Sequence, residues 1–568
     1  MTTARAGTTP GGVAGGVVAC VESLAAEAGA RMLRLGGNAA DAAVATAFAQ
    51  GVADPIYCGI AGGFHGIFHD AARGRTQVVM AGGRAPLAAR PDMWRTTDRW
   101  GAMWSVEGNA NRLGYQASMV PGFIRGAQAA LDRFGSGRIS WQQVIEPAIE
   151  LAEDGFEVYP YLYRIWMPGT PHMASFLESL DGPTVLGHTD ACRDIYLHPD
   201  GSVYQVGERL IQRDYGATLR RIAEYGPDDF YTGAIGRAMA SDFASHGGLI
   251  TAEDLARYTA GVGDAASSTF RGLRVLTEPA PTVGAITLEI LNIIEPWDLA
   301  SAGWNSPEYL DLLVRAMHAG FTDRMTVLGD PDFVDVPQQR LRSKEYAAGL
   351  RRAIEDGGDG GSGHRGSGRG HRGPGNGHRD ETTHVSVLDG AGNAAAITHS
   401  LGMSSGVVTP GLGFQHNCHM VMFDPAPGHR NSIAPWKRPI TGGGPVLFLN
   451  DDDVFLVIGS PAGARKVTAL IQALLNITDF GQSVQQAVSA DRVHTEDEPR
   501  TVIVEPHFPR EPLMGLARMG HRIRFDWYTA RLAAVLRTGD GQLTGGSDPR
   551  GDSGLAVVPP STDEKGMP

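Results

Sequence analysis

The sequence predicts a mixed α/β fold in which antiparallel sheets are covered by helices. β-Like runs occur in pairs joined by turn residues, Thr383–Leu388 with Ala394–Ser400 and Val446–Leu449 with Val454–Ile458. The second pair leads into a strongly apolar helical stretch, Lys466–Phe480. Strand pairs followed by a packed helix are typical of a sheet that carries helices on one face.

Composition limits the class of protein. The chain has 568 residues, which at about 150 residues per domain predicts three or four domains. Hydrophobic residues make up 42% and charged residues 20%, so a largely disordered chain is excluded. Glycine is enriched, at 76 of 568 residues or about 13%, against a usual ~7%. The net charge of −13 argues against a nucleic-acid partner.

Cysteine usage and hydropathy bear on the compartment. Cys20, Cys58, Cys192 and Cys418 lie far apart and form no CxxC pair, which indicates neither a zinc site nor a disulfide framework. No apolar run approaches ~18 residues, so we expect no membrane span. Residues 1–12 are small and polar, without the apolar core of a secretory signal. We therefore expect a cytoplasmic protein that uses no cofactor.

The first elements are a strand and two helices. Gly16–Cys20 is strand-like, and a helical pattern runs from Ser23 to Leu35 and ends at glycines. We expect Asp41 to open an alanine-rich helix that reaches Gln50. The segment Gly59–Gly66 has too many glycines for an ordinary strand, which indicates a tight turn or a close approach of backbones.

The middle of the chain is mainly helical. Thr251 is a typical helix N-cap, with the acidic residues Glu253 and Asp254 in the first turn that follows. The helical patterns cover Gly122–Phe134, Ser140–Asp154, Asp214–Tyr225, Gly233–Ser245, Ala252–Tyr258, Pro307–Leu328 and Ser343–Glu355.

Residues 356–380 contain glycine, serine, histidine, arginine and asparagine and no large apolar residue. We interpret this segment as a solvated tether whose arginines and histidines serve solubility. The residues that follow it carry the strongest chemical signal of the chain, Glu381-Thr382-Thr383-His384. If the bond between Glu381 and Thr382 were cleaved, the new α-amine would be a base beside the threonine hydroxyl. An ordinary strand after a linker is the alternative.

Three further segments are candidates for a site. The glycine-rich Gly459–Arg465 joins a strand to a helix and offers backbone N–H groups to an oxyanion, although a simple helix-start turn explains it too. It lacks the lysine and hydroxyl spacing of a phosphate-binding loop. Thr441 with Gly442–Gly444 indicates backbone near a ligand or a bend before the next strand. His416–His419 carries ligand-type side chains, but alternation along a strand explains this spacing better than a metal site.

Taken together, these segments resemble the γ-glutamyltranspeptidase family of N-terminal nucleophile hydrolases. Matching motifs follow one another in the family's order along some 500 residues. They are Gly36–Val44, Gly59–Gly66, Val120–Gly122, Phe230–Gly233, Gly329–Pro337, Thr382–His384, Lys437–Pro439, Gly459–Pro461 and Gly546–Arg550.

The resemblance implies a four-layer αββα sandwich of two mainly antiparallel sheets. It also implies a precursor that cleaves itself into a large subunit, 1–381, and a small subunit, 382–568. Thr382 would be the nucleophile, supported by Thr383 of the same motif and by Ser400. Backbone N–H groups of Ala462 and Gly463 would form the oxyanion hole.

Departures from the family pattern bear on the substrate. The arginine that pairs with the substrate α-carboxylate aligns with Gly82, and Arg84 is nearby but offset. The residues that hold the amino acid headgroup align with Gly402 and Met422, and a pair of serines aligns with Thr441 and Gly442. An amino acid headgroup without its ion partners would bind several kcal/mol more weakly. We count Arg84, His419, Thr441 and Gly442 as candidate substrate-binding residues.

We therefore expect a hydrolase for a small substrate that is not a γ-glutamyl compound. Relatives of this kind include amide hydrolases and homologues from bacterial antibiotic pathways that cleave a C–C bond in alkylproline-type intermediates. A genuine γ-glutamyl transferase or glutathione hydrolase, with Arg84 as the carboxylate partner, is the alternative. An uncleaved binding or scaffold protein is a third hypothesis.

Overall fold

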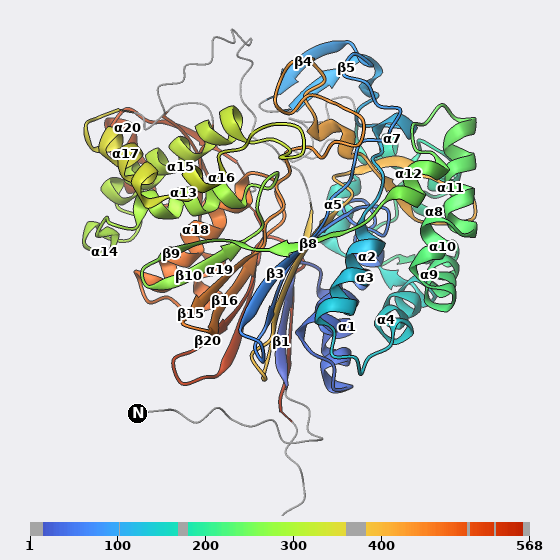
Figure 1. The fold of residues 1–568 in the computed structure, drawn as a ribbon, viewed down its shortest axis with the longest axis horizontal. Coiled ribbons are helices and arrows are strands. Elements are labelled where there is room, and N and C mark those ends of the chain that lie inside the picture. Colours follow the sequence, from blue (N-terminus) through green and yellow to red (C-terminus); the bar gives the residue numbers. More distant parts are fainter. Residues whose placement is uncertain are drawn as a thin grey trace, which may run out of the picture.

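The computed structural model describes residues 15–100, 103–167, 180–358, 382–496, 500–526 and 530–560. Glu381 and residues 359–380 of the expected tether lie outside these ranges. The described residues form four layers, with helices on the outer face of each of two stacked sheets (Figure 1). This arrangement confirms the αββα sandwich. The apolar core fills the three spaces between neighbouring layers of helices and sheets.

The first sheet has seven strands, and every neighbouring pair in it is antiparallel. Its strands, in spatial order, are β22 (Gly554–Val558), β1 (Gly16–Cys20), β11 (Thr383–Asp389), β12 (Ala394–Ser400), β2 (Gly63–Asp70), β3 (Arg75–Ala81) and β8 (Gly261–Asp264). The hairpin β11–β12 thus lies at the centre of the sheet, between strands from the first hundred residues.

The second sheet has six strands, which are also antiparallel throughout. In spatial order they are β21 (Leu543–Ser547), β20 (Ala533–Arg537), β16 (Asp453–Gly459), β15 (Val446–Asn450), β10 (Leu273–Thr277) and β9 (Ala266–Phe270).

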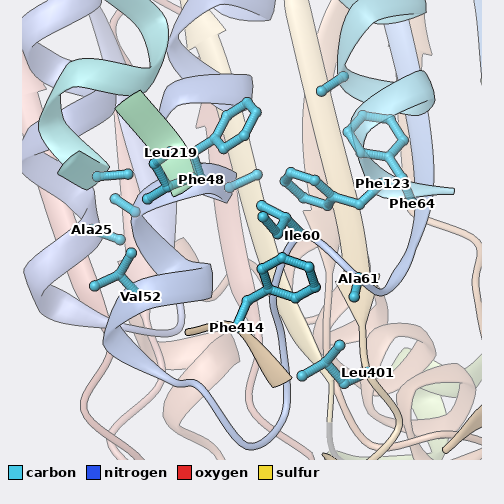
Figure 2. Close-up of a cluster of buried hydrophobic side chains, with 14 of the residues drawn as sticks. Ala25, Phe48, Val52, Ile60, Ala61, Phe64, Phe123, Leu219, Leu401 and Phe414 are labelled. Carbon is cyan, nitrogen blue, oxygen red and sulfur yellow. The ribbon is translucent and has the colours of Figure 1, made fainter. Parts of the chain in front are cut away.

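One helical layer covers the outer face of the first sheet, on the right in Figure 1. Its apolar contacts include the ring of Phe123, which packs edge-on against Phe48 with centroids 5.1 Å apart, and Phe64 beside it (Figure 2). The helices of this layer are α1 (Ser23–Arg34), α2 (Ala39–Ala53), α3 (Phe123–Phe134), α4 (Trp141–Asp154), α5 (Pro160–Trp166), α7 (Gly182–Leu186), α8 (Asp190–Tyr196), α9 (Arg213–Tyr225), α10 (Pro227–Tyr231), α11 (Ala234–Ser245) and α12 (Ala252–Arg257).

The second helical layer covers the six-stranded sheet, on the left in Figure 1. Its most buried helix is α13 (Gly284–Ile294), in which every residue is buried. The other helices are α14 (Leu299–Ala302), α15 (Pro307–Val327), α16 (Gln338–Leu341), α17 (Lys344–Glu355), α18 (Arg465–Thr478), α19 (Val484–Ser489) and α20 (Arg510–Arg518). None of the helices in the described ranges is long and apolar enough to cross a membrane.

Smaller elements decorate the sandwich. The short strands are β4 (Thr96–Trp100), β5 (Met103–Val106), β6 (Phe156–Glu157), β7 (Arg209–Leu210), β13 (Ser404–Val408), β14 (Gln415–Asn417), β17 (Val493–His494), β18 (Thr501–Val504) and β19 (Arg522–Phe525). Single 3₁₀ turns occur at Glu107–Asn109, Tyr115–Ala117 and His419–Met422.

Two local expectations are corrected. The alanine-rich helix begins earlier than Asp41, because Asn38 accepts the N–H groups of Ala40 and Asp41 and Asp41 closes the capping box. The glycine-rich segment is partly a strand, since Gly63–Asp70 pairs along its whole length with β12 and β3. The close approach of backbones expected in this segment occurs at Gly62, the residue before β2. A Cβ there would lie 2.1 Å from the carbonyl oxygen of Ser400.

Candidate active site

The candidate site lies where the layer between the sheets changes from apolar to polar. Along most of their length the inner faces of the two sheets pack aliphatic side chains such as Ile67, Leu388 and Val457. Side chains two residues apart on a strand share a face. Following β2 back from Ile67 therefore reaches His65 and Gly63, and following β11 back from Leu388 reaches His384 and the position of Thr382.

These inner-face positions open onto a cavity of about 50 Å³ at one end of the sandwich. Its walls come from both sheets and from the loops before β15 and α18. The lining residues are Gly63, His65, Met80, Gly82, Gly83, Met119, Pro281, Thr282, Thr382, Thr398, Ser400, His419, Met422, Arg438, Pro439, Thr441, Gly442, Gly443, Gly463 and Lys466.

Thr382 lies directly before β11 and faces this cavity beside Ser400, the last residue of β12. The Thr382 hydroxyl donates to Ser400 Oγ at 3.3 Å, and Thr382 is 7% exposed. The Gly402 N–H donates to Ser400 Oγ at 2.7 Å, which fixes the serine in place. The structure thus brings together the hydroxyl groups of Thr382 and Ser400, which we expected from the sequence to be catalytic.

Thr383 is not brought to the cavity. Because successive residues of a strand point to opposite faces, its side chain enters the layer beneath α2. Its hydroxyl donates to the Glu22 carboxylate and accepts a hydrogen bond from Gln50 at 2.7 Å. Gln50 also donates to the carbonyl of His384 at 3.1 Å. Thr383 therefore anchors the strand that carries Thr382 and does not touch the reacting position.

Glu22 is the charged centre of this anchor. It is 1% exposed, and Gln50 donates to its carboxylate at 2.6 Å. Burial raises the pKa of Glu22, an effect that Arg531 opposes with its guanidinium 3.6 Å from the carboxylate. Burial favours the protonated form of this carboxyl group, whereas the hydrogen bonds from Thr383 and Gln50 favour the ionised form.

A strained turn places backbone N–H groups at the cavity. Ala462 and Gly463 have φ angles of 84° and 49°, and α18 begins two residues later. Ala462 is a β-carbon-bearing residue in the left-handed region, where strain is usually kept for function. Within the described chain neither N–H donates to another group, so both are available to an oxyanion. Gly442 packs against this turn so closely that a Cβ would lie 3.0 Å from Gly463 Cα.

The rings of His419 and His65 lie beside Gly402 and Gly82, two positions that align with residues by which the family holds the substrate headgroup. A Cβ on Gly402 would lie 3.1 Å from the ring of His419, and one on Gly82 would lie 3.0 Å from that of His65. Burial, with a further contribution from His65, lowers the pKa of His419 to about 3, so its ring is neutral at ordinary pH. His65 Nδ1 lies 2.9 Å from Glu278 Oε2.

Arg84 does not line the cavity. Its guanidinium donates to the carbonyl of Trp436 at 2.8 Å, and it lies 3.7 Å from the carboxylate of Asp332. Arg438 does line the cavity, yet it is bound to the buried Asp330 at 2.5 Å and to Asp332 at 3.1 Å. The guanidinium groups near the site are therefore already paired within the protein.

Of the residues expected from the sequence, Thr382, Ser400, His419, Thr441, Gly442 and Gly463 meet at the cavity, and Ala462 adjoins it. Arg84 and Thr383 do not line it, and Glu381 lies outside the described residues. His65, Glu278 and Arg438 were not expected. Strand alternation from Gly63 was a signal for His65, whereas nothing local marks Glu278, which is 213 residues from His65. Among the described residues, no three His, Cys, Asp or Glu side chains are grouped to hold a metal ion.

Comparison with known proteins places this site in a family. The model of the family described as gamma-glutamyltranspeptidase matches residues 25–558. The chain is 35% identical to the acylase ACY 1 proenzyme of Pseudomonas sp. (strain SE83), covering 94% of this chain and 92% of that protein. It is 33% identical to the glutathione hydrolase proenzyme of Escherichia coli (strain K12), covering 94% and 90%. The crystal structure of cephalosporin acylase from Bacillus halodurans superposes with a TM-score of 0.81 at 27% identity, covering 98% and 99%.

These matches agree with the architecture and the site. The relatives are named as acylases and glutathione hydrolases, and two of them are named as proenzymes. The antiparallel αββα sandwich carries a threonine at the start of a central strand, where it faces the cavity. The chain belongs to the γ-glutamyltranspeptidase family and is an autoprocessed hydrolase of the N-terminal nucleophile type.

Proposed function

We propose that the chain cleaves itself between Glu381 and Thr382 and that Thr382 is then the nucleophile of an amide hydrolase. The large subunit would be 1–381 and the small subunit 382–568, together forming one sandwich. The observation that supports this assignment best is the Thr382 hydroxyl, which contacts Ser400 at 3.3 Å in the wall of the cavity. The new α-amine, with a pKa near 8, would serve as its base.

Turnover follows from these groups. The α-amine accepts the hydroxyl proton as Thr382 Oγ1 forms a bond to the substrate carbonyl carbon. The N–H groups of Ala462 and Gly463 donate to the oxyanion. Collapse of the tetrahedral intermediate breaks the C–N bond, and the α-ammonium group gives its proton to the departing amine. Water then attacks the ester by the same route, which releases the acid and restores Thr382.

The acyl group of the substrate is not γ-glutamyl. His65 occupies the space beside Gly82 in which the family's arginine would lie, and Arg84 is engaged with Trp436 and Asp332. Arg438, the arginine in the described lining, is bound to Asp330 and Asp332, so neither arginine is left to pair with an α-carboxylate at this position. An amide substrate agrees with the names of the acylase relatives. Arg84 as a relocated carboxylate partner, the premise of the γ-glutamyl alternative, is not among the residues that line the cavity.

The other reaction implied by the resemblance is hydrolysis of a C–C bond in bacterial antibiotic metabolism of the alkylproline type. It would use the same acyl-enzyme and would differ only in the group that leaves. We place the amide first because the acylase relatives are named for acyl-group chemistry, and C–C hydrolysis and the cytoplasmic location stay predictions.

The test compares purified wild-type protein with Thr382→Ala and Thr382→Ser. Denaturing electrophoresis and intact mass should show two fragments that meet at Glu381–Thr382 in the wild type and in Thr382→Ser, and a single chain in Thr382→Ala. A single uncleaved wild-type chain would support the scaffold hypothesis and overturn this proposal. Robust turnover of γ-glutamyl-p-nitroanilide by the processed wild type would overturn the exclusion of γ-glutamyl substrates.

A further inference from the structure

The loop between β10 and α13, residues 278–283, connects α16 with the wall of the cavity, and we call it the support loop. Two of its residues, Pro281 and Thr282, line the cavity. On the side of α16, the side-chain oxygen of Gln338 accepts the N–H group of Ala280 at 3.0 Å. One hydrogen bond from outside the cavity therefore holds the residue next to its wall.

The support loop receives little other fixation from outside. Thr282 donates its hydroxyl and its N–H to carbonyl groups of the same loop. In the described part of the chain, the remaining hydrogen bonds of residues 279–282 run to Thr441 and to the start of α13. Gln338 is thus the side chain that ties this loop to another layer of the structure.

Gln338 is well placed to hold the loop, because α16 is itself fixed to the core. Leu341 of this short helix is 1% exposed. Asn292 of the buried helix α13 donates its side-chain N–H to the carbonyl of Arg342 at 2.9 Å. The acceptor oxygen for Ala280 therefore sits on a rigid support.

Thr441 links the support loop to the turn that carries the oxyanion donors. Its N–H donates to the carbonyl of Pro281 at 3.2 Å, and its carbonyl accepts the N–H of Val283 at 3.2 Å. Both backbone groups of Thr441 thus bind the loop. The next residue, Gly442, is so close to Gly463 that a Cβ on Gly442 would lie 3.0–3.1 Å from three of its backbone atoms. A shift of the loop would therefore move the segment that packs against the turn.

We propose that Gln338 is a positioning residue for the oxyanion hole, acting through Ala280, the support loop and Thr441. This inference rests on the proposed function, because it takes Ala462 and Gly463 as the donors to the oxyanion of the Thr382 reaction. Such donors are effective only where they are held in place before the reaction. A misplacement of about 1 Å costs on the order of a hundredfold in rate, so partial loosening should cost about tenfold.

Hydrolysis of p-nitrophenyl butanoate, a short activated ester without a charged headgroup, tests the rate effect on self-cleaved enzyme. Gln338→Met keeps the length of the side chain and removes the acceptor, and kcat should fall about tenfold. KM should stay within about twofold, because formation and hydrolysis of the acyl-enzyme both pass through an oxyanion. Gln338→Glu keeps an acceptor oxygen and should retain the wild-type kcat.

Gln339→Met is the matched control, since Gln339 is the exposed neighbour on the same helix. It should leave kcat unchanged, and thermal melting confirms that all variants fold. A wild-type kcat in Gln338→Met, or an equal loss in Gln339→Met, would overturn the inference.

Amide hydrogen exchange tests the path without a substrate. In Gln338→Met the N–H groups of Val283 and Thr441 should exchange at least about tenfold faster than in the wild type, because the bonds between them open more often. Exchange in the hairpin β11–β12 should stay the same. Unchanged exchange at Thr441 would overturn the proposed path.

Failure of the inference can be told from failure of the proposed function. A wild-type chain that does not cleave itself would refute the proposed function, and hydrogen exchange on that chain would still decide whether Gln338 holds Thr441. A cleaved enzyme that forms no acyl adduct on the 382–568 fragment with the ester would refute Thr382 as the nucleophile. Normal turnover in Gln338→Met would refute the inference alone.

Discussion

Gly62→Ala should impair the candidate site without touching any side chain in it. A Cβ on Gly62 would lie 2.1 Å from the carbonyl oxygen of Ser400 and 2.8 Å from its carbonyl carbon. Neither backbone segment can move easily. The Gly62 carbonyl accepts the N–H groups of Gly122 and Phe123, and Ser400 ends a strand that is paired on both sides. Since real Cβ atoms stay at least 3.0 Å from such a neighbour, the backbones must separate by about 0.9 Å.

A separation of about 0.9 Å is enough to break the contact between Thr382 and Ser400. The contact between Thr382 Oγ1 and Ser400 Oγ is already 3.3 Å long, and a further 0.9 Å would end it as a hydrogen bond. A misplacement of about 1 Å at a reacting group costs on the order of a hundredfold in rate. We therefore expect self-cleavage and kcat/KM to fall by about that factor.

Gly59→Ala is the matched control, three residues away. Its added Cβ would meet the side chain of Leu401 at 3.6 Å, an ordinary contact. The assay follows the fraction of cleaved precursor with time by denaturing electrophoresis, and thermal melting confirms that both variants fold. Ser400→Ala removes the same hydroxyl contact without a clash and should slow cleavage as well. Equal cleavage rates for Gly62→Ala and Gly59→Ala would refute the reasoning.

Substitutions at four other positions, one of them also combined with His65→Ala, have expected outcomes. Burial raises the pKa of Glu22 above its unfolded value, so the native chain holds a proton that the unfolded chain releases, and stability falls as pH rises through the native pKa. Relative to Glu22→Gln, the wild-type Tm should therefore decline from about pH 4.5 to about pH 7, the unfolded and native pKa values of this group. Parallel curves would contradict this. Gly82→Arg alone should not create γ-glutamyl-p-nitroanilide turnover, because His65 occupies the space, whereas Gly82→Arg with His65→Ala should create it; activity in the single variant would show that the ring moves freely. Asp548→Ala removes a buried partner that lies 2.7 Å from an arginine and should destabilise the fold by about 3–5 kcal/mol, measured by urea unfolding of the uncleaved Thr382→Ala chain. Asp264→Ala, which loses an exposed ion pair, should cost under about 1 kcal/mol in the same background.

Local sequence was enough to predict much of the fold. The hairpin β11–β12 has the expected bounds to within a residue, because Asp389 closes its turn by accepting the N–H groups of Ala391 and Asn393. Helix α4 matches the helical stretch expected from Ser140 to Asp154, and Ser140 is its N-cap, exchanging hydrogen bonds with Gln143. Strand alternation and capping depend on neighbours within a few residues, so they can be read without knowing the tertiary structure.

Features that depend on distant residues were beyond prediction from the sequence. The strand β2 contradicts the local preference of its glycines, because its neighbours β12 and β3 supply the hydrogen bonds on both sides. In the site, the motif around Thr382 predicted the nucleophile. The pairing of His65 with Glu278 could not be predicted, because it joins a strand to a loop 213 residues further along the chain. The offset Arg84 looked available in the sequence, and only its contact with Trp436 shows that it is occupied.

The order of strands determines how a nicked chain would behave. If the backbone is broken before Thr382, β1 belongs to one fragment and both of its neighbours, β22 and β11, belong to the other. In the second sheet, β10 and β9 of the first fragment continue the ladder from β15 of the second. Neither fragment retains a complete sheet, so we expect the two to be needed in equal amounts and to acquire their structure while still joined. A single gene product that is cut after folding meets both conditions, and fragments made separately should aggregate through their open strand edges.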